Sequence, residues 1–290
     1  MPTSAVAAPF GVERSGVRLA GEELGNGPPV VLLHGLTATR RYVVMGSAAL
    51  PRSGHRVISY DARGHGESSP APEPTAYGYR DLTADLLAVL DQLGVERAVL
   101  VGASMGAHTA LAAALEHPRR VAGLVVITPG YDPDTHDDPS SLARWDRLSA
   151  GLRDGGVEGF LAAYGEPEVP PAWRETVVRA IRQRLASHRH PEAVADALSA
   201  VPRSRPFASL DELEALDVPA IVVGSRDEAD PGHPLVLAQA YSRVLRRARL
   251  AVEDAGHSPL AWQGGQVSRL AAEVAAAAWA GEGGPAGGPR

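Results

Sequence analysis

The sequence contains no cysteine and no lysine, and all 28 basic residues among its 290 are arginine. Without cysteine the chain has no thiolate nucleophile, no disulfide framework and no cysteine-ligated zinc or iron–sulfur site. Without lysine it has no Schiff-base residue, no pyridoxal-phosphate anchor and no P-loop lysine. Covalent catalysis by this chain must therefore use serine, threonine, aspartate, glutamate, histidine or tyrosine.

Basic charge and long apolar runs are also scarce. The formal net charge is −6 at pH 7, which argues against a nucleic-acid partner. The longest apolar runs, 29–33 and 121–129, fall far below the ~18 residues that indicate a transmembrane helix. No basic segment precedes an apolar stretch near residue 1, as it would in a signal peptide. We therefore expect a cytoplasmic protein without a membrane partner; the oligomeric state is not predictable from these features.

The hydrophobic pattern alternates between strands and helices. Short runs rich in β-branched residues have the continuous apolar character of parallel strands buried on both faces. These runs are 30–33, 56–60, 98–102, 124–128, 220–224 and 248–252. Helical patterns cover 79–93, 104–116, 234–244 and 259–280. The alternation predicts an α/β fold with a doubly wound, mostly parallel sheet.

One interval, residues 130–218, interrupts the alternation. It holds helical patterns near 141–153, 157–163, 172–187 and 192–200, and no convincing strand. An interval of 89 residues is too long for a connection between two strands. We predict an inserted all-helical cap at 130–218 over one end of the sheet. The core domain is then 11–129 and 219–280, with disordered tails at 1–10 and 281–290.

The sharpest motif is Gly102-Ala103-Ser104-Met105-Gly106, which matches the pattern G-x-S-x-G. It lies directly after an expected strand and before an alanine-rich helix, the context in which this pattern marks a nucleophilic serine. The glycines permit the strained turn that lifts Ser104 above the end of the sheet. The amino terminus of the helix would stabilise developing negative charge. A plain tight turn or a phosphate loop is the alternative interpretation.

Four further motifs follow the order found in the α/β-hydrolase superfamily, which the sequence resembles from about residue 16 to residue 280. The motifs are His34-Gly35-Leu36, Asp61-Ala62-Arg63-Gly64-His65-Gly66-Glu67-Ser68, Gly224-Ser225-Arg226-Asp227 and Gly256-His257-Ser258-Pro259. Each motif alone is weak, but their order along the chain makes the set specific. The resemblance implies an esterase-like enzyme with a Ser-Asp-His triad and a helical cap.

A serine hydroxyl needs an adjacent base, and histidine has a pKa suited to exchanging a proton near pH 7. His257 lies on a glycine-flanked loop in the position of the superfamily's catalytic histidine, and it is the expected base. His65 belongs to the second motif and is interpreted as structural. The other histidines outside the motifs are interpreted as surface or core residues: His55, His108, His117, His136, His188, His190 and His233.

Asp227 is the expected acid that orients the base, because it fits the superfamily's G-x-x-D spacing after a late strand. Asp230, three residues further on, is the close alternative, and Glu228 is a weaker one. Some relatives place the acid one strand earlier, where this chain has Asp132. We interpret Asp132 as a turn residue.

The tetrahedral intermediate of acyl transfer needs two preorganised N–H donors. The backbone N–H groups of Met105 and Leu36 are the expected oxyanion hole. His34 is expected to shape the loop that carries Leu36. The residues assigned to the substrate pocket are His34, Trp145, Phe160 and Trp173. For the three aromatic residues, plain packing inside the cap is the alternative.

These features predict hydrolysis of a small-molecule carboxylic ester, lactone or thioester through an acyl-Ser104 intermediate. A cofactor-free lyase, a perhydrolase or an oxygenase-like enzyme that uses the triad for proton transfer is the alternative, and a non-catalytic binding protein is a third. We expect no cofactor and no metal. His188 and His190 could be read as a metal-binding pair. They are two residues apart near a helix end, so their side chains would lie on different faces and would not share a metal.

Overall fold

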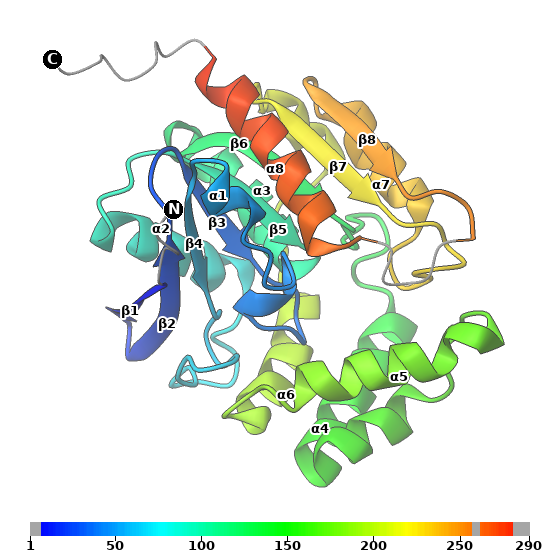
Figure 1. Ribbon diagram of the computed structural model, residues 1–290. Coiled ribbons are helices and arrows are strands. Elements are labelled where there is room, and N and C mark those ends of the chain that lie inside the picture. Colours follow the sequence, from blue (N-terminus) through cyan, green and yellow to red (C-terminus); the bar gives the residue numbers. More distant parts are fainter. Residues whose placement is uncertain (1–6, 257–261, 281–290) are drawn as a thin grey trace, which may run out of the picture.

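The computed structural model describes residues 7–256 and 262–280. These residues form an eight-stranded sheet in the order β1-β2-β4-β3-β5-β6-β7-β8 (Figure 1). The strands are β1 (Ala8–Arg14), β2 (Val17–Leu24), β3 (Pro29–Leu33), β4 (Arg56–Tyr60), β5 (Ala98–Ala103), β6 (Val121–Ile127), β7 (Ala220–Gly224) and β8 (Ala248–Val252). From β4 to β8 in this order, neighbouring strands are parallel. The predicted mostly parallel sheet is confirmed.

The hairpin of β1 and β2 lies where the sequence pattern predicts no strand. Ser15 and Gly16 form its turn with positive φ angles of 50° and 75°, as in two-residue hairpin turns that match the strand twist. The register pairs Arg14 with Val17 across this turn. β1 begins at Ala8, so the expected disorder of residues 8–10 is wrong. The partly exposed β1 lacks the apolar run that marks the inner strands.

Helices cover both faces of the sheet, as a doubly wound fold requires. Alternate strand residues such as Val31 and Leu100 pack against α2 (Tyr79–Gln92), α3 (Met105–Glu116) and α7 (Leu235–Val244). The residues between them, such as Val30 and Val101, pack against α1 (Ala49–Arg52) and α8 (Gly264–Trp279) on the opposite face. Burial on both faces explains why these strands are continuous apolar runs.

Between β6 and β7 the described chain contains helices and no strand. The main helices are α4 (Pro139–Tyr164), α5 (Pro171–Leu185) and α6 (Pro191–Ala200), which lie together at one end of the sheet (Figure 1). The sequence pattern predicts two separate helices in the range that α4 covers. The structure has a kink at their junction, because Gly156 has a non-helical φ of 60° and ψ of −147°. This layer matches the cap expected from the sequence.

The cap is attached to the core by apolar packing and by backbone hydrogen bonds. Phe160 and Leu198 of the cap belong to one buried cluster with Leu36 and Met105 of the core. His188, between α5 and α6, accepts a hydrogen bond from the Gly66 N–H at 2.9 Å and faces the Thr37 carbonyl at 3.1 Å. The base of the cap is thus fixed beside the loops at the carboxyl end of the sheet.

Across residues 7–256 and 262–280, no helix is both long enough and apolar enough to cross a membrane.

The contact between α3 and β3 at Gly106 predicts a sharp loss of stability on substitution. A Cβ at Gly106 would overlap the Leu33 carbonyl oxygen, which belongs to β3 and cannot move aside. We expect Gly106→Ala to lower the free energy of unfolding by about 3 kcal/mol, measured by urea denaturation. Gly155→Ala is the matched control, because its Cβ would meet no described atom within 4 Å. Equal stability of the two variants would contradict the close packing.

Candidate active site

Ser104 lies at the turn between β5 and α3. Its φ of 48° and ψ of −113° are strained for a residue with a side chain. A Cβ at Gly102 would overlap the Gly106 carbonyl, so the strand and the helix can meet only through glycine. The Ser104 N–H donates to the Ile127 carbonyl of β6 at 2.9 Å. The G-x-S-x-G pattern therefore forms the strand–turn–helix elbow, with Ser104 at its apex.

The imidazole of His233 lies against the Ser104 hydroxyl. Nε2 of His233 is 3.0 Å from Oγ of Ser104, and Nδ1 is 2.8 Å from Oδ2 of Asp230. A carboxylate accepts hydrogen bonds and does not donate, so we assign the proton of neutral His233 to Nδ1. Nε2 is then the acceptor for the Ser104 O–H. The side chains of Ser104, His233 and Asp230 are therefore hydrogen-bonded in series.

Asp230 and His233 are the ends of one turn, Asp230-Pro231-Gly232-His233, in the connection from β7 to α7. The His233 N–H donates to the Asp230 carbonyl at 3.1 Å. Aspartate in the first position and proline in the second are residues that β-turns favour. Pro234 follows directly and further restricts the backbone. Asp230 and His233 are therefore held in a single stiff segment.

The acid predicted from the sequence has a different contact in the structure. Asp227 is exposed, and its Oδ1 accepts a hydrogen bond from the Leu235 N–H at the start of α7 at 2.7 Å. No described histidine bonds to Asp227. His257, the expected base, lies outside the described residues, so the Asp227–His257 pair stays a prediction.

The other acidic candidates also have local partners. Oε1 of Glu228 accepts from the Gly256 N–H at 3.1 Å. Asp132 accepts from the Asp134 N–H at 3.0 Å and from the Thr135 hydroxyl at 3.1 Å, as expected for a turn residue.

The sequence pattern does not predict the contact of His233 with Ser104, because it interprets His233 as a surface or core residue. The signal that could have found it is the turn chemistry of residues 230–233. An aspartate, a proline and a glycine precede this histidine directly, in the loop where the acid is expected. The helical periodicity of 234–244 obscures this turn, because it suggests that His233 belongs to the start of the helix.

The environment of His233 raises its pKa above the ordinary value of 6.5. Burial by itself lowers the pKa, but the charge and hydrogen bond of Asp230 outweigh the burial. The positive charge of the Arg184 guanidinium, on α5, lowers the pKa of His233. The side chains of His233 and Asp230 are 27% and 31% exposed, so the pair lies at the rim of the site and not deep in the core.

The loop after β3 orients the N–H group of Leu36. The Leu36 N–H and the Gly35 carbonyl belong to the same trans peptide, so they point in opposite directions. The Gly35 carbonyl faces Nδ1 of His34 at 2.8 Å. Fixing the carbonyl on one side directs the Leu36 N–H to the other. A Cβ at Gly35 would lie 3.6 Å from Cβ of Ser104, so the loop runs directly beside Ser104.

Met105 is the first residue of α3, and its N–H therefore has no acceptor one turn earlier in the helix. Together with Leu36 it offers two backbone donors next to Ser104. The oxyanion hole stays a prediction that this geometry supports.

His34 does not offer a polar group to a substrate. It is 3% exposed, and both ring nitrogens are engaged, Nδ1 with the Gly35 carbonyl and Nε2 with the Ala62 N–H at 2.9 Å. These contacts fit the expected role of His34 in shaping the loop, and its assignment to the substrate pocket stays a prediction.

The loop Asp61–Ser68 supports the segment that carries Leu36. His65 is 1% exposed and lies between the carbonyls of Arg63, at 2.9 Å, and Leu36, at 2.7 Å. Arg63 forms a bidentate pair with Asp85, each contact 2.7 Å long, and both side chains are buried. The motif is therefore structural, and it fixes one wall of the site.

The aromatic residues assigned to the substrate pocket differ in their surroundings. Phe160 is 3% exposed inside the cap and stacks on Tyr164, with ring centroids 6.1 Å apart. Trp145 packs half-buried against the same cluster. Trp173 is half-buried near the start of α5. For Phe160 the packing is that of a cap core residue, and none of the three is shown to contact a substrate.

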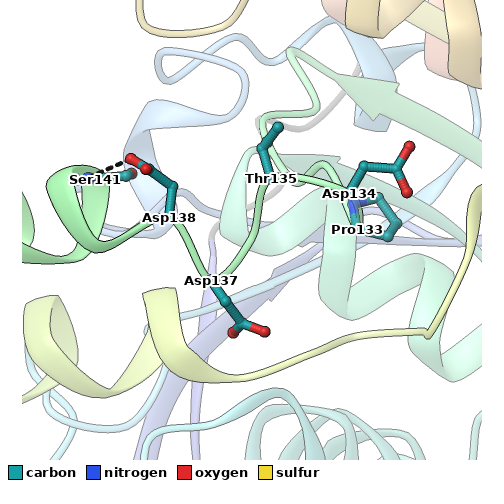
Figure 2. A pocket seen from close by; sticks show the side chains of 6 residues that line it. All are labelled: Pro133, Asp134, Thr135, Asp137, Asp138 and Ser141. Atoms are coloured by element: carbon teal, nitrogen blue, oxygen red, sulfur yellow. Dashed lines mark hydrogen bonds between the residues drawn. The ribbon is translucent and has the colours of Figure 1, made fainter.

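A surface pocket of about 580 Å³ lies away from Ser104, in the loop before α4 and at the start of that helix (Figure 2). Two of its three carboxylates have partners: Asp138 accepts from the Ser141 N–H at the helix start, and Asp137 pairs with Arg205. Asp134, Asp137 and Asp138 point apart in Figure 2. The site of chemistry is therefore assigned from the Ser104 geometry and not from pocket size.

Comparison with known proteins identifies the family. Residues 28–188 match the family model of the alpha/beta hydrolase fold. A candidate carbamate hydrolase of Variovorax paradoxus, RutD, is 30% identical over 205 residues, covering 70% of this chain and 75% of that protein. The sn-1-specific diacylglycerol lipase ABHD11 of Mus musculus is 41% identical over 113 residues. That match covers 38% of this chain and 36% of the lipase, so the chain spans about a third of the lipase's length.

A solved structure extends the similarity to nearly the whole fold. A thermophilic esterase from Thermogutta terrifontis superposes with a TM-score of 0.72 and 29% sequence identity. The alignment covers 93% of this chain and 97% of that esterase.

The buried histidines predict a loss of stability in acid. Burial lowers the pKa of His34 and of His108 to about 3, and it also lowers the pKa of His65. At pH values below the ordinary histidine pKa of 6.5, these histidines bind protons in the unfolded chain but stay neutral in the folded protein. The free energy of unfolding should therefore fall between about pH 6.5 and pH 3, by up to ~1.4 kcal/mol per pH unit for each histidine.

Urea unfolding at several pH values between 5 and 7.5 measures this slope. His108→Gln should make the slope shallower, whereas His117→Gln, at a partly exposed surface position, should leave it unchanged. An identical slope in wild type and His108→Gln would show that His108 is not held neutral in the folded state.

Proposed function

Because the chain belongs to the α/β-hydrolase family, we propose that it is a serine hydrolase that cleaves carboxylic esters of small molecules. The observation that carries the proposal is Ser104, which lies at the elbow apex with a histidine Nε2 3.0 Å from its hydroxyl. The backbone N–H groups of Leu36 and Met105 are the proposed oxyanion donors, because the loop of Gly35 and the start of α3 both adjoin Ser104. The similarity to an esterase over 93% of the chain supports the same activity.

The reaction follows from these positions. A histidine accepts the Ser104 proton as Oγ attacks the ester carbonyl, and the two N–H groups stabilise the oxyanion. The same histidine returns the proton to the departing alcohol, which leaves an acyl-Ser104 ester. Water, activated by the histidine, then releases the carboxylic acid and restores Ser104. The proposal requires a histidine base, whichever residue supplies it.

The walls around Ser104 favour an apolar acyl or alcohol group. Leu36 and Met105 belong to the buried apolar cluster that continues into Phe160 and Leu198 of the cap. Lactones and thioesters react through the same acyl-enzyme, so they fall within the proposed substrate class. A lyase or perhydrolase reaction is the competing function.

The direct test is Ser104→Ala assayed against chromogenic esters, lactones and thioesters. We expect kcat/KM to fall by about 10⁴-fold or more, because the covalent step is lost while the fold is kept. A serine-directed phosphonate should add its mass at Ser104 of the wild-type protein, as located by peptide mass spectrometry. Circular dichroism of the variant serves as the control for folding.

Two outcomes would refute the proposal: full activity in Ser104→Ala, or phosphonate labelling at a different residue. Absence of turnover on every ester, lactone and thioester, together with turnover of a lyase or perhydrolase substrate, would favour the competing function.

A further inference from the structure

We propose that Arg184 of the cap binds a carboxylate of the substrate, so that the enzyme prefers esters that carry a negative charge away from the bond that is cleaved. The inference rests on the proposed serine-hydrolase function and names a specificity-determining residue for it. The substrate class is an anionic ester, in which an apolar chain separates the ester group from the carboxylate.

Arg184 lies on the face of α5 that packs inward. Ile181 and Leu185 of this helix are buried, and Val177 packs against the same apolar cluster. Arg184 is three residues after Ile181 and seven after Val177, and these spacings place side chains on one face of a helix. A charged residue therefore occupies a position in the apolar stripe of α5.

The inward face of α5 lies against the residues that adjoin Ser104. Leu185, the neighbour of Arg184, belongs to the buried cluster that also contains Leu36 and Met105. The cap helices lie at the end of the sheet where the elbow after β5 is located (Figure 1). The side chain of Arg184 is therefore directed toward the boundary between the cap and the core.

The guanidinium of Arg184 has no ion-pair partner in the part of the chain that the structure describes. Its Nε is buried and makes no hydrogen bond there. Arg182, on the exposed side of the same helix, binds both carboxylate oxygens of Glu158 at 2.8 and 3.0 Å. A desolvated charge without a partner destabilises a fold. The donors of Arg184 thus remain for a group outside the chain, and a guanidinium fork matches the two oxygens of a carboxylate.

The groups that act on the charge of Arg184 come from both the cap and the core. They are the Asp230 carboxylate, the phenol of Tyr164 at the end of α4 and the phenol of Tyr42 in the loop after β3. Oδ2 of Asp230 is already 2.8 Å from Nδ1 of His233. Burial lowers the pKa of Arg184, but a guanidinium stays protonated in proteins. One positive charge balances one negative charge, which favours a carboxylate over a phosphate monoester.

The charge of Arg184 also reaches the surroundings of Ser104. It lowers the pKa of His233, whose Nε2 is 3.0 Å from Oγ of Ser104. With an ester carbonyl at Ser104, a short chain can extend along the apolar cluster of Leu36 and Phe160 and end at the guanidinium. The apolar walls and the unpaired charge therefore select different parts of one substrate.

The first experiment varies the charge of the substrate at nearly constant shape. Monomethyl esters of linear dicarboxylic acids, from succinate to suberate, are compared with the methyl esters of the corresponding monoamides. A second series places the carboxylate on the alcohol, with fatty-acid esters of glycolate compared with those of glycolamide. We expect kcat/KM for the best acid ester to exceed that for its amide by about 100-fold. A preference in either series supports the proposal, and the absence of a preference in both overturns it.

Arg184→Met tests whether this residue causes the preference. The ratio of kcat/KM for the acid ester to that for its amide should fall to near unity, because the carboxylate loses its charged partner. Arg182→Gln is the matched control on α5 and should keep the wild-type ratio. Arg184→Lys keeps the charge without the fork and should give an intermediate ratio. A wild-type ratio in Arg184→Met would overturn the assignment.

A binding measurement separates recognition from turnover. In Ser104→Ala, isothermal titration calorimetry should give a Kd for the acid ester about 100-fold below that for its amide. Adding Arg184→Met to this variant should remove the difference. Arg184→Met alone should not lower the melting temperature, since it removes an unpaired charge. A lower melting temperature together with equal Kd values for the acid ester in the single and double variants would assign Arg184 a structural role only.

Failure of this inference and failure of the proposed function give different results. If Ser104→Ala keeps its activity, the serine-hydrolase function fails. If Ser104→Ala is inactive, while acid and amide esters react and bind alike in the two series, only the substrate class fails. Should Arg184→Met misfold by circular dichroism, Arg184→Lys decides: a reduced ratio supports the proposal, and a wild-type ratio overturns it.

Discussion

The close approach of α3 to β3 at Gly106 is the contact on which the site depends. It lets the chain turn within two residues of a buried strand, and it places Ser104 in a strained conformation above the sheet edge. The same approach brings the Gly35 loop beside Ser104. A single methyl group at Gly106 would separate the helix from the strand and move Ser104 relative to the loop of Gly35. The strain at Ser104 is therefore maintained by packing around it.

Histidines occupy two distinct environments around this elbow. His34, His65 and His108 are buried, and burial lowers their pKa values, so at neutral pH they act as fixed hydrogen-bonding groups for loop backbone. His233 lies at the rim of the site beside a carboxylate, which raises its pKa. In a chain without cysteine or lysine, histidine thus occurs in two different electrostatic environments near Ser104. Solvent exposure and a charged partner make the difference.

The strand and helix pattern predicts the fold because each inner strand is buried on both faces and each helix has one apolar stripe. The hairpin of β1 and β2 escapes prediction, because its exposed strand lacks an apolar run and its turn depends on positive φ angles at Ser15 and Gly16. The elbow at Ser104 is predictable because it needs glycine on both sides of this residue. The contact between His233 and Ser104 spans 129 residues, and only tertiary structure reveals it.

The central claim is that Ser104 carries the acyl group during turnover. Mixing the protein with a p-nitrophenyl ester and quenching in acid within the first turnover traps the intermediate for peptide mass spectrometry. The account predicts one acyl group per chain, located on Ser104, together with a burst of p-nitrophenol of equal stoichiometry. Product formation with no acylated peptide, or with the acyl group on another residue, would contradict it.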